Sequence, residues 1–240
     1  MSDSSEEIRI NKYLAACGIC SRREADRLIE EGRILVNGEP AVSGYKVTGN
    51  EEISFDGDVI KGPERKAYLA FYKPVGVTVS EKDEHAETLI SELIDYPVRV
   101  TYAGRLDKDS EGLILLTNDG ELINRLMRGA NGHEKEYIVG IDREVTEEII
   151  AAFEKGIYLK ELKIKTKPAG AEKIGKRRMR VVLTQGLNRQ IRRMCEACGV
   201  RVTFLKRVRV ANIKLGDLSE GEYRELTKEE ILELRREVNL

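Results

Sequence analysis

The chain has 240 residues, of which 35% are charged, and its 41 lysines and arginines nearly balance its 42 aspartates and glutamates, which gives a net charge of −1. This length allows one large domain or two smaller ones, with a substantial buried core. No apolar run approaches the length of a membrane span, and residues 1–7 lack the basic and apolar regions of a signal peptide, so we expect no membrane association and a cytoplasmic location.

The basic residues are unevenly distributed along the chain. Residues 160–214 contain 17 lysines and arginines but only three acidic residues, a net charge of +14, whereas the remainder of the chain carries −15. This asymmetry indicates a polyanionic partner on one face of the protein. The alternative is a basic face that is neutralised by the protein's own acidic residues, and the sequence leaves both open.

The first sixty residues predict two short helices followed by a small sheet. Ile10, Leu14 and Cys17 recur at helical spacing before a glycine, and Ser21 begins a capping box for the next helix. Residues 33–38 predict a strand that ends in an Asn-Gly turn, and short strands follow between residues 47 and 60. The polar segment 61–66 contains glycine and proline, so we place a boundary between domains 1–62 and 63–240.

The first of these domains resembles the S4 RNA-binding domain in Ile10-Asn-Lys-Tyr-Leu-Ala-Ala, Ser21-Arg-Arg-Glu-Ala and the run from Ile29 to Gly38. Arg22 and Arg23 lie in the first turn of a helix, where the helix dipole disfavours cations. This position indicates phosphate contacts, with solubilising surface charges as the alternative. Because residues 1–62 contain eight basic and twelve acidic residues, the domain alone is expected to bind RNA weakly.

Two turns in the middle of the chain are candidates for a functional site. Residues 67–72 predict a strand that leads into the turn Lys73-Pro-Val-Gly. Residues 99–120 predict a strand, a polar turn, a buried strand and a helix start, and the turn carries Arg105 and Asp107. A guanidinium and a carboxylate two residues apart at the mouth of a sheet are typical of a functional site, and a solvated hairpin turn is the alternative.

Two later segments carry further candidates. Residues 134–140 predict a strand with Tyr137 near its start, which taken alone is more often a packing residue. Residues 185–194 predict a glycine turn that leads into a helix, with Arg189 and Arg192 at its beginning.

Three of these segments together resemble the RsuA-type pseudouridine synthases. They are Tyr-Lys-Pro-x-Gly at residues 72–76, Gly-Arg-Leu-Asp-x-x-Ser-x-Gly-Leu from residue 104, and Gln-Gly-Leu-Asn-Arg-Gln-Ile-Arg from residue 185. The form of the second motif and His-Glu-Lys-Glu-Tyr at residues 133–137 are most similar to RluF-type enzymes of 23S ribosomal RNA, which act near the peptidyl-transferase centre. The resemblance implies an α+β catalytic domain built on a long, mostly antiparallel mixed sheet.

The resemblance also implies roles for individual residues. It makes Asp107 the catalytic aspartate, Tyr137 the residue that stacks on the target base, and Arg192 the basic partner of Asp107. The substrate-binding residues that we expect are Arg105, Arg22, Arg23, Arg189 and Lys73, although the Lys73 turn fits a supporting role beneath the site better. A guanidinium near Asp107 favours the ionised carboxylate, which would act as a nucleophile at C1′ or as a base at C2′.

Isomerisation of uridine neither gains nor loses a group or an electron, so no cofactor is expected, and the sequence contains no dinucleotide-binding or P-loop motif. The pairs Cys17/Cys20 and Cys195/Cys198 have 174 residues between them and lie on predicted amphipathic helices, so no metal site is expected. The expected partner is 23S ribosomal RNA, and the expected state is a monomer. A non-catalytic S4-type RNA-binding or ribosome-assembly protein, and the same chemistry on a tRNA, are the alternatives.

Overall fold

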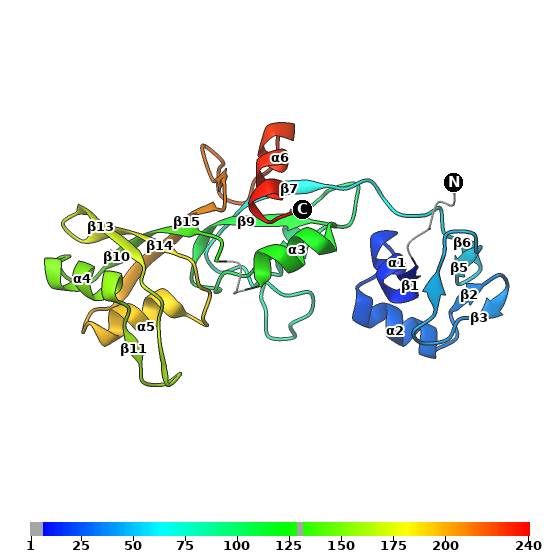
Figure 1. Cartoon of the computed structure of the whole chain (residues 1–240), viewed down its shortest axis with the longest axis horizontal. Coiled ribbons are helices and arrows are strands. Elements are labelled where there is room, and N and C mark those ends of the chain that lie inside the picture. The colour runs from blue at the N-terminus through cyan, green and yellow to red at the C-terminus, as the bar shows by residue number, and fades with distance from the viewer. Residues whose placement is uncertain (1–6, 129–131) are drawn as a thin grey trace. The chain divides into compact units, whose positions relative to one another are not determined.

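The structure is a computed structural model, and it describes residues 7–128 and 132–240. The chain divides into two compact units (Figure 1). The first unit ends at Lys66 but also includes Pro97–Val100, and the second consists of Ala67–Tyr96 and Thr101–Leu240. No pattern in the sequence predicts that Pro97–Val100 belongs to the first unit.

The first unit combines two helices with two small antiparallel sheets. Its elements are β1 (Ile8–Arg9), α1 (Ile10–Ala16), α2 (Arg22–Glu30), β2 (Ile34–Val36), β3 (Glu39–Pro40), β4 (Lys46–Val47), β5 (Ile53–Phe55) and β6 (Asp58–Val59). β1 pairs with β4, and the other strands form a sheet in the order β3-β2-β5-β6. The Ser21 hydroxyl caps α2 by accepting a hydrogen bond from the N–H of Glu24. The buried faces of both helices pack with Ile34 and Ile53 of the sheet in one core.

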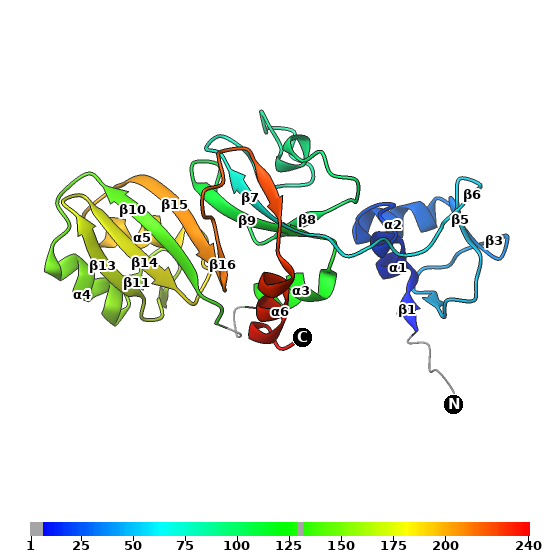
Figure 2. The same ribbon diagram turned by 90° about the horizontal axis from the view of Figure 1, so that it is seen from above.

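The second unit is built on a nine-stranded sheet in the order β13-β14-β10-β15-β9-β7-β17, in which β8 also pairs with β9 and β16 with β15 (Figures 1 and 2). The bounds are β7 (Tyr68–Lys73), β8 (Thr101–Ala103), β9 (Glu111–Thr117), β10 (Lys135–Ile141), β13 (Gly170–Gly175), β14 (Arg178–Leu183), β15 (Val202–Val210), β16 (Ile213–Lys214) and β17 (Tyr223–Glu225). All of these pairs are antiparallel except β9–β15. The predicted α+β architecture with a mixed, mostly antiparallel sheet is therefore confirmed.

The two halves of this sheet join through the short parallel pairing of β9 with β15, where Glu111 lies opposite Lys206 and Gly112 opposite Arg207. Gly112 has a φ of 107°, and a Cβ atom there would lie 2.3 Å from the carbonyl oxygen of Arg207. The close approach of the two strands at this point therefore requires glycine.

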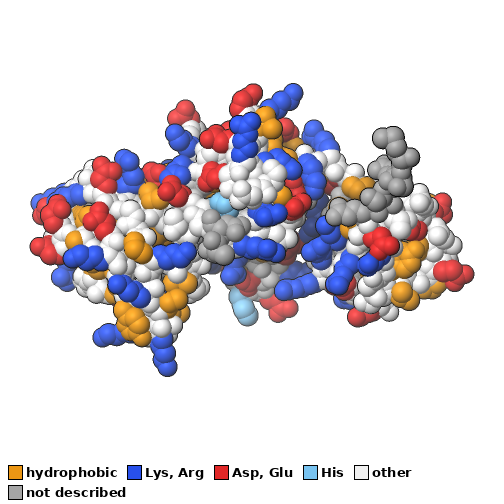
Figure 3. Space-filling view, in the orientation of Figure 1, with side chains coloured by type: hydrophobic (Ala, Val, Ile, Leu, Met, Phe, Trp, Pro, Cys, Tyr) orange, Lys and Arg blue, Asp and Glu red, His pale blue; other side chains and the backbone are white. Residues whose placement is uncertain are grey.

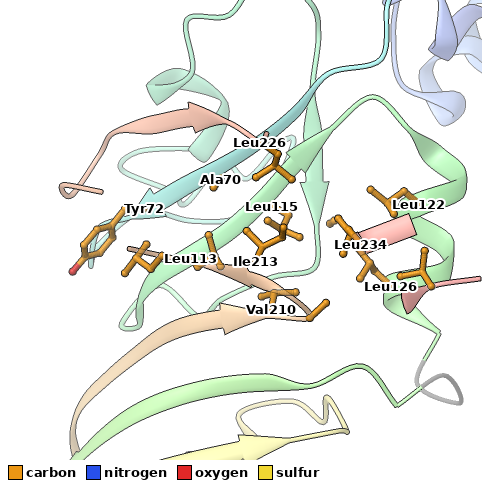
Figure 4. Close-up of a cluster of buried hydrophobic side chains, with 14 residues drawn as sticks. Ala70, Tyr72, Leu113, Leu115, Leu122, Leu126, Val210, Ile213, Leu226 and Leu234 are labelled. Carbon is orange, nitrogen blue, oxygen red and sulfur yellow. The ribbon is translucent and has the colours of Figure 1, made fainter. Parts of the chain in front are cut away.

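The remaining elements pack against the sheet or connect its strands. They are η1, a 3₁₀ helix (Ile90–Leu93), α3 (Gly120–Met127), α4 (Glu147–Lys155), β11 (Tyr158–Leu159), β12 (Ile164–Lys165), α5 (Gln190–Ala197) and α6 (Lys228–Glu237). Leu122 and Leu126 of α3 and Leu234 of α6 pack with β9 and β16 in one apolar core (Figure 4). Within residues 7–128 and 132–240, no helix is long and apolar enough to cross a membrane.

Candidate active site

The turn between β8 and β9 carries the predicted catalytic aspartate. It closes through a hydrogen bond from the N–H of Ser110 to the carbonyl oxygen of Asp107, at 3.1 Å. The N–H of Gly76 donates to the carbonyl oxygen of Lys108 at 2.8 Å, so the turn after β7 supports this one directly. The supporting role expected for the Lys-Pro-Val-Gly turn thus has a specific contact.

Lys73 ends β7 beneath the same turn and is fully buried. Its ammonium group donates to the carbonyl oxygens of Pro74 and Ser110 at 2.7 Å each and to that of Lys108 at 3.3 Å. Burial lowers the pKa of Lys73 to about 8, and nearby carboxylates oppose this effect only in part. The expectation that Lys73 binds substrate is therefore wrong for this structure, because its charge is occupied in holding the backbone of the turn.

Arg189 and Arg192 approach this turn from the beginning of α5. The distance between Arg192 Nε and Asp107 Oδ2 is 3.9 Å, and the distance between Arg189 Nη1 and the same oxygen is 3.6 Å. The structure therefore brings Arg192 close to Asp107, as the motifs predict, and places Arg189 beside it. Neither distance allows a good hydrogen bond.

Arg189 forms a bidentate pair with Asp109. Arg189 donates from Nη1 and Nη2 to the two carboxylate oxygens of Asp109, at 3.2 and 3.1 Å. Arg192 Nη2 donates to the carbonyl oxygen of Asp109 at 2.8 Å and to the buried hydroxyl of Ser110 at 3.1 Å. Partial burial works against ionisation of Asp109, but the hydrogen bonds from Arg189 and the charge of Arg192 lower its pKa below the ordinary value.

Tyr137 and Arg105 lie with Asp107 in one pocket that is open to solvent. Ser110, Arg189 and Gln190 also contribute to its lining. Tyr137 is a largely buried residue of β10, which pairs with β15 at the centre of the sheet. Arg105 is exposed at the mouth of the turn. A planar base that enters this pocket would meet a tyrosine ring, a carboxylate and a guanidinium.

Arg22 and Arg23 belong to the first unit, at the start of α2, and both are exposed. Their expected role in binding RNA stays a prediction, because it depends on a partner that contacts this helix. The charge asymmetry has a structural counterpart: 12 of the 17 basic residues between positions 160 and 214 are exposed. Figure 3 shows some of these side chains around the projecting segment that contains β11 and β12.

Two residues near the site have roles that the sequence does not single out. Asp109 lies inside the aspartate motif, where it looks like one more surface charge of the turn. Arg207 resembles its basic neighbours on β15, yet it is buried, and its Nε donates to the carbonyl oxygen of Leu113 at 2.7 Å. No local pattern distinguishes Arg207, because its burial depends on the pairing of β15 with β9. Among the described residues, no group of three or more His, Cys, Asp or Glu side chains is arranged to hold a metal ion.

Comparison with protein-family models gives two matches. Residues 67–197 match the model of RNA pseudouridylate synthases, and residues 8–53 match that of the S4 domain. The first match contains Asp107, Asp109, Tyr137, Arg189 and Arg192.

Curated proteins and solved structures give similar results. The chain is 42% identical over 236 residues to the dual-specificity RNA pseudouridine synthase RluF of Escherichia coli. The aligned region covers 98% of this chain and 80% of the relative. It is 37% identical to the ribosomal large subunit pseudouridine synthase B of Bacillus subtilis, over 95% of each chain. A crystal structure of a pseudouridylate synthase superposes with a TM-score of 0.70 at 32% identity and covers 95% of this chain and 99% of that one.

Proposed function

This chain belongs to the RNA pseudouridylate synthase family, and we propose that it converts a specific uridine of 23S ribosomal RNA, near the peptidyl-transferase centre, to pseudouridine. The family and the S4 domain make the chain an RNA-modifying enzyme, in preference to the non-catalytic alternative. The names of the relatives from E. coli and B. subtilis support the large ribosomal subunit as the substrate. With such a substrate, we expect the enzyme to act in the cytoplasm and as a monomer.

The reaction breaks the bond between N1 of the base and C1′, turns the uracil, and joins C5 to C1′; C5 loses a proton and N1 gains one, so the product is an isomer of uridine. Asp107 is the group that we assign to the ribose, as a nucleophile at C1′ or as a base at C2′. The observation that carries this assignment is its place in the pocket with Tyr137, 3.6 Å from one guanidinium and 3.9 Å from another.

The target uridine must leave its RNA stack to enter the pocket, which costs a few kcal/mol. Tyr137 lies where it can stack on the uracil, and the exposed Arg105 lies where it can hold a phosphate or occupy the vacated space. The exposed basic residues of positions 160–214, together with Arg22 and Arg23, are proposed to supply compensating backbone contacts.

The word "dual-specificity" in the name of the E. coli relative supports a second RNA substrate, and a tRNA is the alternative that the sequence leaves open. Carbodiimide-probed primer extension on ribosomal RNA and tRNA from a deletion strain tests both. We expect at least one uridine in 23S RNA to go unmodified and to be restored by the wild-type gene. An unchanged 23S pattern would refute the proposed substrate.

The assigned role of Asp107 is tested by Asp107→Asn in the same complementation. The amide keeps the size of the side chain but is neither a nucleophile nor a base of useful strength, so we expect no pseudouridine. RNA binding, measured separately, is expected to change less than about threefold, because one central charge contributes little to an interface dominated by phosphate contacts. Restoration of the modification by this variant would contradict the assignment.

A further inference from the structure

Asp109, not Asp107, receives the strong hydrogen bonds of the site. Both guanidinium nitrogens at the end of Arg189 donate to its carboxylate, at 3.2 and 3.1 Å. Arg192 Nη2 lies 3.4 Å from Asp109 Oδ2 and donates to the Asp109 carbonyl oxygen. The carboxylate and the backbone of one residue therefore fix the positions of two arginines that lie 80 and 83 residues further along the chain.

The same arrangement leaves the carboxylate of Asp107 close to positive charge but without a hydrogen bond from it. The two guanidinium groups are 3.6 and 3.9 Å from Asp107 Oδ2. The nitrogen at 3.9 Å, Arg192 Nε, is buried and has no hydrogen-bond partner in the described structure. A buried donor without a partner is uncommon in proteins. The other end of the same guanidinium group, Arg192 Nη2, is bound to the carbonyl oxygen of Asp109 and the hydroxyl of Ser110.

This arrangement has a chemical consequence. Both guanidinium groups lie 3.6–3.9 Å from Asp107 Oδ2, where their charge acts on the carboxylate to which we assign the reaction. The environment of Asp107 therefore depends on what holds the two arginines in place.

We propose that Asp109 is a positioning residue that holds Arg189 and Arg192 beside Asp107. This inference rests on the proposed role of Asp107. Asp109 does not touch the reacting atoms and acts through the two arginines. It is suited to this role because it lies in the same turn as Asp107, whose backbone is fixed by Lys73 and by the Ser110–Asp107 hydrogen bond.

Asp109→Asn tests the proposal. The amide keeps the shape of the side chain, but it cannot accept both arms of Arg189, so we expect the arginines to be held less firmly beside Asp107. Single-turnover formation of pseudouridine on saturating RNA is expected to fall at least tenfold, while the Kd for RNA changes less than threefold. Asp109→Glu, which keeps the carboxylate, is expected to recover part of the rate.

The recovery by Asp109→Glu, together with the unchanged Kd, distinguishes positioning from a general structural role. A variant that is merely less well folded would not recover with glutamate, and its lower Tm would show it. Glu172→Gln is the matched control, because Glu172 is an exposed carboxylate that pairs with Arg180 at 3.4 Å outside the pocket, and we expect its rate to match the wild type.

A double-mutant cycle with Arg189→Met keeps the test decisive if Asp109→Asn folds poorly. If Asp109 acts by holding Arg189, removing its carboxylate should lower the rate much less in the Arg189→Met background than in the wild type. Equal losses in the two backgrounds, or an unchanged rate in Asp109→Asn, would overturn the proposal. Wild-type protein without activity would refute the proposed function and this inference together, whereas active wild type with an unaffected variant would refute only the inference.

Discussion

Gly112→Ala should destabilise the catalytic unit at the junction of the two half-sheets. A Cβ atom at this position would lie 2.3 Å from the carbonyl oxygen and 2.7 Å from the nitrogen of Arg207, and both are backbone atoms that cannot rotate away. The φ of 107° is itself unfavourable for alanine, at about 1–3 kcal/mol. Separating two paired strands to relieve the overlap adds about 1–3 kcal/mol. The two contributions give a loss of about 4 kcal/mol in the free energy of unfolding.

Thermal unfolding followed by circular dichroism measures this loss. A change of 1 kcal/mol shifts Tm by about 2–4 °C for a unit of 150–250 residues, so we expect a decrease of about 8–16 °C. Gly120→Ala is the control, because Gly120 begins α3 without a positive φ, and a methyl group added there would have no atom within 4 Å. Its Tm is expected to remain equal or to rise slightly. A decrease below about 2 °C for Gly112→Ala would show that β9 and β15 do not need to approach as closely as the structure indicates.

Two further predictions concern buried polar groups. Burial lowers the pKa of Lys73 from 10.5 to about 8. Between these two pH values the unfolded chain binds more protons than the folded chain. The free energy of unfolding should therefore rise with pH across this range, by up to about 3 kcal/mol from this group. Urea unfolding at about pH 7.5 and about pH 10 should show this rise in the wild type and a smaller one in Lys73→Met, and identical pH dependence in both would contradict it. Asp119→Ala removes the N-cap of α3 and the acceptor for the hydroxyl of Tyr68 at 2.8 Å, so we expect a loss of about 2–4 kcal/mol in urea unfolding. Tyr68→Phe keeps the cap and should lose only about 1 kcal/mol, so equal losses in the two variants would refute the capping contribution.

Several features of this protein follow from local sequence patterns alone. The pattern at Ser21 predicts a helix start, and the Ser21 hydroxyl accepts a hydrogen bond from the backbone of the helix that it precedes. The run from Leu113 to Leu116 predicts a buried strand, and all four residues are buried in β9. These features depend on contacts between residues a few positions apart, so the local sequence is sufficient to determine them. The family motifs likewise identify Asp107 and Tyr137 as candidates for one site, and they share a pocket.

The choice of partners inside the site was decided by tertiary structure. The sequence predicts an arginine beside Asp107, but whether Arg189 and Arg192 hydrogen-bond Asp107 or Asp109 depends on differences of less than about 1 Å at the start of α5. Those differences depend on how the long sheet places the turn with Asp109 beside the start of α5, which lies 80 residues further along the chain. No local sequence pattern encodes them. The burial of Lys73 has the same origin: a lysine at a strand end looks exposed in sequence, and only the turn folded over it supplies the three carbonyl groups that bind its charge. Hydrogen bonds act over tenths of an ångström, so the sequence by itself determined which residues meet, and the fold decided which of them bind each other.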